Sequence, residues 1–234
     1  MLINNRELTK ISTYFTVVIK SNTKATPELM KYCERNNIQL LDESYNLGFG
    51  DNNNYIYSYL KNSKQITDCD YFLVINPDIT IELEKLKELY RNILELDADI
   101  FTINLYKDSK YRIMEPSIKK FPTLLGPFRG LFNKNSRKDA YDKTKITSPV
   151  IIDWAAGSFL LFKKNSYEEL CGFNDKFFMY FEDVDICRRA KLKKMHLMYL
   201  PHIDAIHAGA FKNRNIFSRH FIWYIRSYLR YHFL

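Results

Sequence analysis

The sequence predicts an α/β fold in which a mostly parallel, mixed sheet has flanking helices and an amphipathic helix ends the chain. Two observations predict this fold. Short apolar, β-branched runs alternate with segments whose apolar residues recur at a helical period, which is typical of strand–helix–strand units with right-handed crossovers. The apolar runs also lack the two-residue alternation of a half-exposed strand, and this favours strands covered on both faces.

The N-terminal half of the chain contains four expected strands and three expected helices. The strands are expected over residues 14–19, 38–41, 71–75 and 99–104. The helices are expected after Pro27, over residues 51–60 and over residues 81–96. The last of these has apolar residues at positions 83, 86, 89, 93 and 96, a spacing that puts them on one helix face.

The C-terminal half begins with a segment of different character. Residues 107–148 are polar and are interrupted by Pro116, Pro122, Gly126 and Pro127, so we expect irregular structure with one short helix. Strands are expected over residues 150–154, 158–162 and 195–200. Helices are expected over residues 165–171 and from Glu182 onward.

The last segment is basic and amphipathic, so we expect a domain over residues 1–210 and a separate helix over residues 211–234. At 100° per residue, three of its arginines fall within about 40° of one another. The basic residues are Lys212, Arg214, Arg219, Arg226 and Arg230, and the apolar side carries Phe217, Phe221, Tyr224, Ile225, Tyr228 and Leu229. Two interpretations stay open: a helix lying on an anionic membrane, or a helix that docks its apolar face on the domain.

Composition and charge restrict the class of protein. The 234 residues are 46% apolar and 26% charged, as in globular proteins. The formal net charge of +8 favours an anionic partner, but the basic residues are spread along the chain without a nucleic-acid-binding motif, so no nucleic-acid partner is expected. No apolar run approaches the ~18 residues of a membrane span. The four cysteines have no C-x-x-C spacing, which favours a reduced, cytoplasmic setting.

Asp78 is the first candidate for chemistry. It follows the expected strand at residues 71–75 in the sequence Asn76-Pro77-Asp78. Ligands bind beyond the carboxyl ends of strands in open α/β sheets, and a carboxylate there can hold a divalent cation. The alternative is a Pro-Asp turn that caps the next helix.

Three carboxylates, Glu182, Asp183 and Asp185, follow an aromatic cluster over residues 177–181. A carboxylate held in such a pocket can act as a general base. The alternative is an acidic first turn that the helix dipole favours, since the later turns of this segment are basic.

Two weaker signals complete the set. Asn46, Gly48 and Gly50 lie in a turn between a strand and a helix, where the backbone can approach a phosphate or ribose oxygen; the alternative is an ordinary strand-to-helix turn. His207 follows the last expected strand, and a single histidine there is either structural or part of a site.

Five motifs occur in a recognisable order. They are N-L-G-F-G-D-N-N-N, F-L-V-I-N-P-D-I, D-W-A-A-G-S-F-L-L, G-F-N-D-K-F-F-M-Y-F-E-D-V-D-I-C and A-I-H-A. In this order they resemble family 2 glycosyltransferases with the GT-A fold, a Rossmann-like architecture, and especially the bacterial lipopolysaccharide O-antigen rhamnosyltransferases. The resemblance covers nearly the whole chain from Thr16 onward, and its specific part is E-D-V-D together with N-P-D.

The resemblance implies a function. It implies an inverting transfer of a sugar from a nucleotide-sugar donor, dTDP-L-rhamnose in the rhamnosyltransferases, to a hydroxyl of an undecaprenyl-diphosphate-linked saccharide. It also implies Mg²⁺ or Mn²⁺ as cofactor. We therefore expect a protein of O-antigen biosynthesis that lies peripherally on the cytoplasmic face of the membrane.

The resemblance also implies roles for the residues of catalysis and metal binding. Asp183 matches the catalytic base, and Glu182 and Asp185 position the acceptor or the base. Asp78 matches the metal-binding aspartate, and His207 matches a histidine that completes the metal and diphosphate site.

Five further residues match substrate-binding positions. Asn46 and Gly48 match the turn that lies against the nucleotide, and Asn76 occupies the first position of the metal motif. Trp154 and Gly157 match a strand edge that lines the sugar and acceptor pocket.

The start of the chain departs from the family pattern. Residues 16–22 match the second strand of the family and residues 1–13 only the tail of the preceding helix, so we expect the first strand to be missing and the chain to be N-terminally truncated. Absence of an interior strand would leave unpaired backbone groups on both neighbours. Two functions stay open: an active transferase, or a truncated, inactive homologue that acts only as a membrane- or partner-binding protein.

Overall fold

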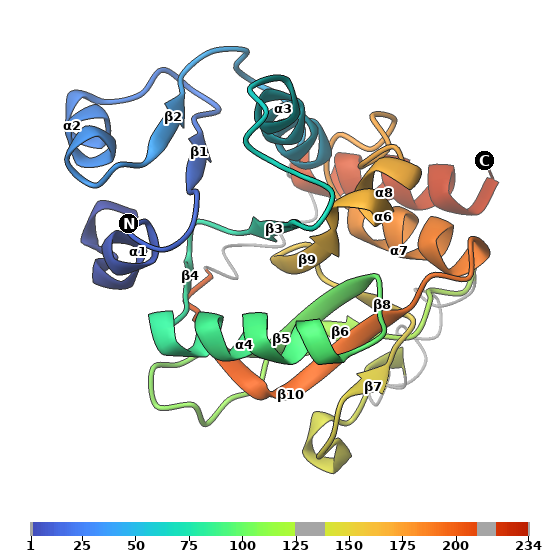
Figure 1. Cartoon of the computed structure of the whole chain (residues 1–234). Helices are drawn as coiled ribbons and strands as arrows, with labels where there is room; N and C mark the ends of the chain where they lie inside the picture. Colours follow the sequence, from blue (N-terminus) through green and yellow to red (C-terminus); the bar gives the residue numbers. More distant parts are fainter. Residues whose placement is uncertain (1, 125–138, 210–218, 234) are drawn as a thin grey trace.

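The centre of the fold is a six-stranded mixed sheet, which Figure 1 shows with helices on both sides. The computed structural model describes residues 2–124, 139–209 and 219–233. The strands of this sheet are β3 (Tyr71–Ile75), β4 (Ile79–Thr80), β5 (Ile100–Tyr106), β7 (Val150–Ile151), β9 (Phe159–Lys163) and β10 (Leu197–His207). Five of them follow the order β3-β9-β5-β10-β4, and β7 pairs with β10.

The strand directions define an α/β fold with a mixed sheet, as predicted. β9 runs antiparallel to both of its neighbours, β3 and β5, and β10 runs parallel to β5. β3, β5 and β10 therefore share one direction, and β9 lies between β3 and β5 in the opposite direction. β4 and β7 pair with β10 in antiparallel fashion.

β10 is longer than the strand expected over residues 195–200. Its register against β5 shifts between Leu200 and Asp204, where Pro201 has no N–H to donate to the ladder. Beyond this irregularity the strand resumes and continues to His207, which lies opposite Ile79 of β4. Because of this extension, His207 lies at the same edge of the sheet as the C-terminal end of β3.

The N-terminal part forms a separate two-stranded sheet. Its strands, β1 (Val18–Lys20) and β2 (Gln39–Leu41), are parallel and are connected through α2 (Pro27–Arg35). β1 begins later than expected, because the N–H groups of Tyr14 and Phe15 donate to the carbonyl of Ile11 and close a turn. Among the described residues β1 pairs only with β2 and β3 only with β9, so each strand has one edge without a strand partner.

The helices agree closely with the helical periods in the sequence. They are α1 (Arg6–Ile11), α2, α3 (Phe49–Asn62), α4 (Leu83–Glu95), α6 (Lys164–Glu169), α7 (Glu182–Leu192) and α8 (Arg219–Phe233), with short 3-10 turns η1 (Leu2–Asn4) and η3 (Lys143–Lys145). Side-chain capping explains the start of α2. There the Thr26 hydroxyl accepts the N–H of Leu29 over 3.3 Å, and Pro27 occupies the first turn, where no donor is needed.

The expected irregular segment contains little regular structure. Its short strand β6 (Ile118–Lys119) pairs with β8 (Trp154–Ala155) in antiparallel fashion, and η3 is its single helical turn among the described residues. Residues 125–138, including Gly126 and Pro127, lie outside the described residues.

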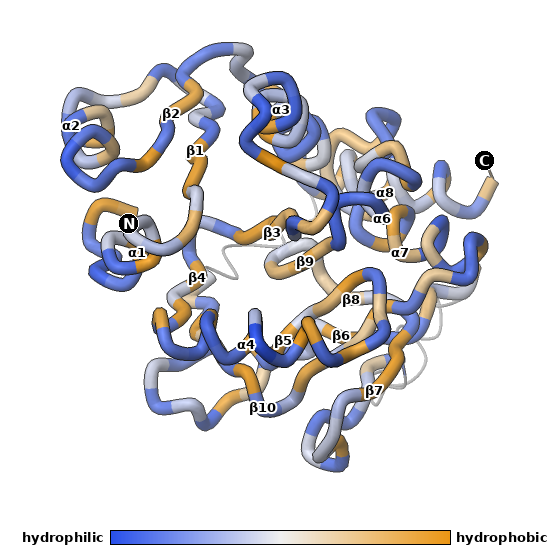
Figure 2. The backbone as a smooth tube through the Cα atoms, viewed as in Figure 1, coloured by the Kyte–Doolittle hydropathy of each residue, from blue (hydrophilic) through white to orange (hydrophobic). Residues whose placement is uncertain are grey.

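Both faces of the central sheet are covered by apolar side chains. On one face Phe72 and Val74 of β3 pack in a cluster with residues of α3, α6 and α7. On the other face Phe101 and Ile103 of β5 pack in a cluster with the buried side of α4. Figure 2 shows the apolar segments along β3, β5 and β10. The prediction that these runs are covered on both faces is confirmed.

α8 docks only part of its apolar surface on the rest of the chain. Tyr228 and Tyr231 are buried in a cluster with Phe177, Phe181 and Val184. Six other apolar or aromatic residues of the helix stay exposed, namely Phe221, Ile222, Tyr224, Ile225, Leu229 and Phe233. In the described ranges no helix combines the length and hydropathy that crossing a membrane requires. Lys212, Arg214 and Phe217, which we expected in this helix, lie outside the described residues.

Candidate active site

The turn after β3 brings Asp78 beside the end of β10. Ile79 pairs with His207, and in this register the N–H of Ala208 donates to the Asp78 carbonyl over 3.0 Å. His207 Nε2 lies 3.2 Å from Asp78 Oδ1. The two residues predicted to bind a cation therefore lie next to each other.

His207 has a second carboxylate partner, Glu115, which is absent from the residues predicted above. His207 Nδ1 lies 2.7 Å from Glu115 Oε2, and Glu115 is only 8% exposed. The two residues are 92 positions apart, and Glu115 lies in the irregular segment without a motif around it. A carboxylate directly before Pro116 is the sole local signal, and it is not specific.

The three side chains form a carboxylate–imidazole–carboxylate row. The contact with His207 lowers the pKa of the Asp78 carboxyl, against the effect of burial. Burial by itself lowers the pKa of His207, but the contacts with Asp78 and Glu115 and the charges of both outweigh it and raise this pKa to about 9. His207 is therefore a cation at neutral pH when no metal ion is bound.

This row predicts a pH dependence of stability. The pKa of His207 is higher in the folded chain than its ordinary 6.5, so its contribution to stability is complete below pH 6.5 and is lost as the pH rises through 9. In EDTA, we expect the free energy of unfolding of the wild type, relative to His207→Gln, to fall by about 3 kcal/mol across this range. Urea unfolding at several pH values measures it, and parallel curves for the two proteins would contradict it.

Asp78 and His207 fit a divalent cation as part of its donor set. Asp78 Oδ1 is buried and has no hydrogen-bond partner among the described residues, because the contact with His207 is an ion pair without hydrogen-bond geometry. Carboxylate oxygen and imidazole nitrogen both bind Mn²⁺-type ions. Across residues 2–124, 139–209 and 219–233 no three His, Cys, Asp or Glu side chains surround one metal position, so further ligands would come from substrate oxygens or water.

Asp183 lies in the first turn of α7 and faces the loop between β8 and β9. Its Oδ2 accepts the N–H of Gly157 over 3.0 Å, and its Oδ1 accepts the N–H of Val184 over 2.8 Å. Burial raises the pKa of Asp183, whereas these two N–H groups and the charge of Lys119 oppose the increase. The carboxylate is thus held at two points.

Glu182 is in a different environment from its neighbour. It is 6% exposed, and its Oε2 has no hydrogen-bond partner among the described residues. Burial and then the charge of Asp183 raise the pKa of Glu182. Two backbone N–H groups stabilise a negative charge on Asp183, and Glu182 Oε2 has no such donor among the described residues, so Asp183 is better suited than Glu182 to carry the charge of the pair.

Asp185 is engaged away from this pair. Its Oδ2 accepts a hydrogen bond from Arg189 Nε over 2.7 Å within α7. The same guanidinium donates to the carbonyls of Leu170 and Gly172. Asp185 therefore ties α7 to the end of α6, and the structure does not bring it to Asp183.

The residues before Asp183 have an unusual backbone that α8 contacts directly. Tyr180 and Phe181 both have left-handed φ angles, 68° and 67°. The Phe181 ring packs against Tyr228 and Tyr231, and the Ser227 hydroxyl donates to the Met179 carbonyl over 2.9 Å. α8 thus holds the segment from which the acidic turn of α7 begins.

Gly48 lies where the chain from Asn46 to α3 meets the segment before α7. A Cβ on Gly48 would lie 2.4 Å from the Phe178 carbonyl oxygen, and the same oxygen accepts the N–H of Phe49 over 3.1 Å. Gly48 is therefore required for close packing. Asn46 has a left-handed φ of 61° and is exposed, so its side chain is accessible to a ligand.

Gly157 contacts Asp183, and Trp154 packs against the cluster that contains the next residue, Val184. The Trp154 indole N–H donates to the Lys120 carbonyl over 2.8 Å, and Lys119 Nζ lies 5.3 Å from the centre of the indole ring. A Cβ on Gly157 would lie 3.0 Å from the Phe49 ring and 3.4 Å from Asp183 Cβ. Gly157 and Trp154 form part of the surroundings of Asp183, and Lys119 adds a positive charge there.

One turn, residues 156–158, connects the two groups of carboxylates. The N–H of Gly157 donates to Asp183, while the carbonyl of Ser158 accepts the N–H of Asn76 over 2.9 Å. The N–H of Ala156 donates to Ser117. Asp78 and Asp183 therefore lie on segments bonded to adjacent residues of the same turn.

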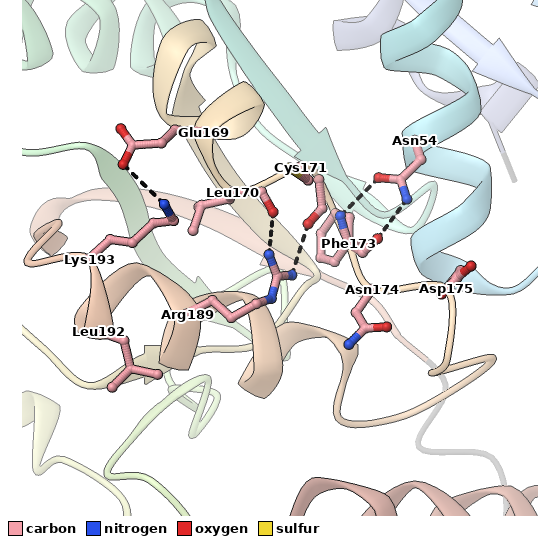
Figure 3. A pocket seen from close by; sticks show the side chains of 11 residues that line it. Asn54, Glu169, Leu170, Cys171, Phe173, Asn174, Asp175, Arg189, Leu192 and Lys193 are labelled. Atoms are coloured by element: carbon pink, nitrogen blue, oxygen red, sulfur yellow. Dashed lines mark hydrogen bonds and ion pairs between the residues drawn. The ribbon is translucent and has the colours of Figure 1, made fainter. Parts of the chain in front are cut away.

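A cavity also lies away from these residues. It has a volume of about 750 Å³ and is lined by residues of α3, α6, α7 and the α6–α7 loop (Figure 3). Its main polar groups already have partners: Asn54 bonds both backbone groups of Phe173, and Arg189 bonds two carbonyls. None of the predicted site residues lines it.

The fold is that of GT-A glycosyltransferases. The crystal structure of GalNAc-T7 with UDP, GalNAc and Mn²⁺ is similar with a TM-score of 0.65 at 11% identity, over 98% of this chain and 43% of that one. The crystal structure of Staphylococcus aureus TarS is similar with a TM-score of 0.56 at 18% identity, over 89% of this chain and 34% of that one. At these identities the similarity shows the fold alone.

Sequence relatives define the family. Rhamnosyltransferase WbbL of Escherichia coli K12 is 35% identical over 184 residues, which are 79% of this chain and 69% of WbbL. The low-salt glycan biosynthesis hexosyltransferase Agl10 of Haloferax volcanii is 27% identical, over 85% of this chain and 60% of Agl10. No protein-family model matches the sequence. The chain belongs to the family 2 glycosyltransferases, and its predicted resemblance to them is confirmed.

A third relative has a more specific name. The N-acetylglucosaminyl-diphospho-decaprenol L-rhamnosyltransferase of Mycobacterium tuberculosis is 26% identical, over 74% of this chain and 60% of that protein. The chain thus spans between 60% and 69% of the length of these three relatives.

Proposed function

We propose that the chain transfers L-rhamnose from dTDP-L-rhamnose, with inversion, to a saccharide linked to a lipid diphosphate in O-antigen or related cell-surface polysaccharide synthesis. The names of WbbL and of the mycobacterial relative support the rhamnosyl group, and the second name supports a lipid-diphosphate acceptor. The observation that carries the proposal is the placement of Asp78 and Asp183 on segments bonded to the same turn.

The proposed reaction is a displacement at the anomeric carbon. An acceptor hydroxyl attacks this carbon, the bond to the nucleoside diphosphate breaks, and the hydroxyl proton passes to a base. Asp183 is suited to accept that proton, because two backbone hydrogen bonds fix its orientation and favour its charged form. The N–H of Gly157 positions this carboxylate, and Glu182 lies buried next to it in the chain.

The leaving diphosphate gains negative charge during the displacement. Asp78 and His207 would hold a Mg²⁺ or Mn²⁺ ion, which when bound stabilises that charge as a Lewis acid. Glu115 holds the His207 ring from its other nitrogen and so fixes the orientation of the metal-facing nitrogen. Asn46, Gly48 and Asn76 would line the nucleotide side of the site.

The acceptor places the reaction at a membrane. α8 presents an exposed apolar stripe beside Arg219 and Arg226, an arrangement suited to the surface of an anionic bilayer. In this proposal the chain is peripheral on the cytoplasmic face of the membrane. One side of the C-terminal helix docks on the domain, and the other side contacts the bilayer.

A donor screen tests the function. Purified protein is incubated with dTDP-L-rhamnose, other nucleotide sugars and a lipid-diphosphate-linked N-acetylglucosamine analogue, with Mn²⁺ or with EDTA. We expect a disaccharide product from dTDP-L-rhamnose that EDTA abolishes. Transfer from a different donor would contradict the assignment of rhamnose. Failure of every donor, together with intact binding to anionic vesicles, would favour the alternative of an inactive binding protein.

A further inference from the structure

A second cavity lies between α8 and the segment before α7. Its volume is about 440 Å³, and it is separate from the site around Asp78 and Asp183. It is lined by Asp175, Lys176, Phe178, Trp223, Arg226, Ser227 and Arg230.

The charge of this cavity is positive. Three cations, Lys176, Arg226 and Arg230, line it together with one carboxylate, Asp175. In the part of the chain that the structure describes, none of the three cations forms a salt bridge. Arg230 donates to the Lys176 carbonyl, which holds the two sides of the cavity together. Arginine and lysine side chains in this arrangement suit a phosphate or diphosphate group.

The cavity also borders apolar surface. Phe178 and Trp223 pack against each other in it, with ring centroids 5.0 Å apart. At 100° per residue, Arg226 lies on the helix between this aromatic side and the exposed stripe of Ile222, Leu229 and Phe233. A ligand with an anionic head group and a long apolar chain could therefore bind its head group to the cations and its chain to the apolar side chains of α8.

Packing links the cavity to the proposed base. The Phe178 carbonyl accepts the N–H of Phe49, the Phe49 ring lies against Gly157, and the N–H of Gly157 donates to Asp183. The cavity is thus separated from the Asp183 carboxylate by two packed residues.

We propose that this cavity binds the diphosphate head of the lipid-linked acceptor, with the prenyl chain lying along the exposed stripe of α8. This inference rests on the proposed function for the identity of the acceptor. It assigns Lys176 and Arg226 to the diphosphate and Phe178 and Trp223 to the first part of the prenyl chain, and none of the predicted site residues lines this cavity.

Farnesyl diphosphate is the probe for this proposal. Calorimetric titration of the whole chain is done in EDTA, so that no metal ion holds the diphosphate at Asp78. We expect farnesyl diphosphate to bind more tightly than either farnesol or inorganic diphosphate. Arg226→Glu and Lys176→Glu should each weaken it by about tenfold or more, since each reverses one charge at the head group.

Arg219→Glu is the matched control, because Arg219 is an exposed arginine of the same helix outside the cavity. It should leave farnesyl diphosphate binding unchanged. Equal binding of farnesol, no loss in either cavity variant, or an equal loss in Arg219→Glu would overturn the proposal. The head groups of a bilayer are the other possible source of phosphate, and vesicles of phosphatidylcholine and phosphatidylglycerol test for it. If the chain binds these vesicles but not farnesyl diphosphate, and Arg219→Glu and Arg226→Glu weaken vesicle binding equally, the surface is a bilayer contact and the proposal is wrong.

The outcome is separable from that of the proposed function. Binding of dTDP with Mn²⁺ should be the same in Arg226→Glu and in the wild type, because the cavity variant leaves the donor site intact. If farnesyl diphosphate binds as expected but no donor is used, the transferase proposal fails and the cavity assignment stands. If rhamnose is transferred equally well by Arg226→Glu and the wild type to the lipid-linked acceptor, the cavity assignment fails and the transferase proposal stands.

Discussion

Replacing Asp183 with Asn should lower the turnover number of sugar transfer by ~10²–10⁴-fold, the usual contribution of a general base. An amide has nearly the same shape as the carboxylate, and its oxygen can still accept the N–H of Gly157, although the N–H of Val184 loses its acceptor. The packing around the site should therefore persist. The amide cannot accept the hydroxyl proton. Affinity for dTDP in Mn²⁺ should therefore stay nearly unchanged, which steady-state kinetics and a nucleotide titration would show together.

Asp68→Asn is a suitable control for this experiment. Asp68 is a strongly exposed carboxylate that pairs with Lys164, so the same chemical change there should leave turnover unaffected and alter stability by at most about 1 kcal/mol. Full activity of Asp183→Asn would exclude Asp183 as the base. A large loss of nucleotide affinity in this variant would assign Asp183 to the donor site instead.

Replacing Asp78 with Ala should act on binding. Loss of this carboxylate removes one ligand from the cation and leaves His207 with Glu115 alone. We expect the affinity for dTDP in Mn²⁺ to fall by roughly tenfold to a hundredfold or more, while the much weaker affinity in EDTA should not change. Titrations of Mn²⁺ by electron paramagnetic resonance, with and without dTDP, would measure the loss directly.

The two substitutions together separate the roles. Asp183→Asn is expected to alter the chemical step and Asp78→Ala the metal-dependent binding of the donor. The reverse pattern, with turnover lost at 78 and binding lost at 183, would exchange the two assignments.

Local sequence patterns predict much of this fold, and the reasons are physical. The apolar run at residues 71–75 is followed at once by Asn76-Pro77, and proline ends a strand because it lacks an N–H. The structure accordingly has β3 at Tyr71–Ile75. The spacing of apolar residues over 81–96 likewise predicts α4, since a surface helix needs one apolar stripe.

Contacts between distant residues were beyond such patterns. Glu115 is important because it meets His207 across 92 positions, and neither residue has a neighbour in sequence that reports this contact. The continuation of β10 past Pro201 depends on a partner strand, β4, that supplies the pairing on its far side. The sequence could identify Gly48 as a turn residue, but only the fold shows that the Phe178 carbonyl needs its space.

The left-handed backbone at Tyr180 and Phe181 has a consequence for how activity and architecture are connected. Non-glycine residues cost of order 1 kcal/mol each in this region, so the peptide persists only while its surroundings brace it, and α8 supplies that brace through Ser227, Tyr228 and Tyr231. The C-terminal helix thus supports the segment that leads into α7. We therefore expect removal of α8 to disturb the first turn of α7 and the placement of its carboxylates.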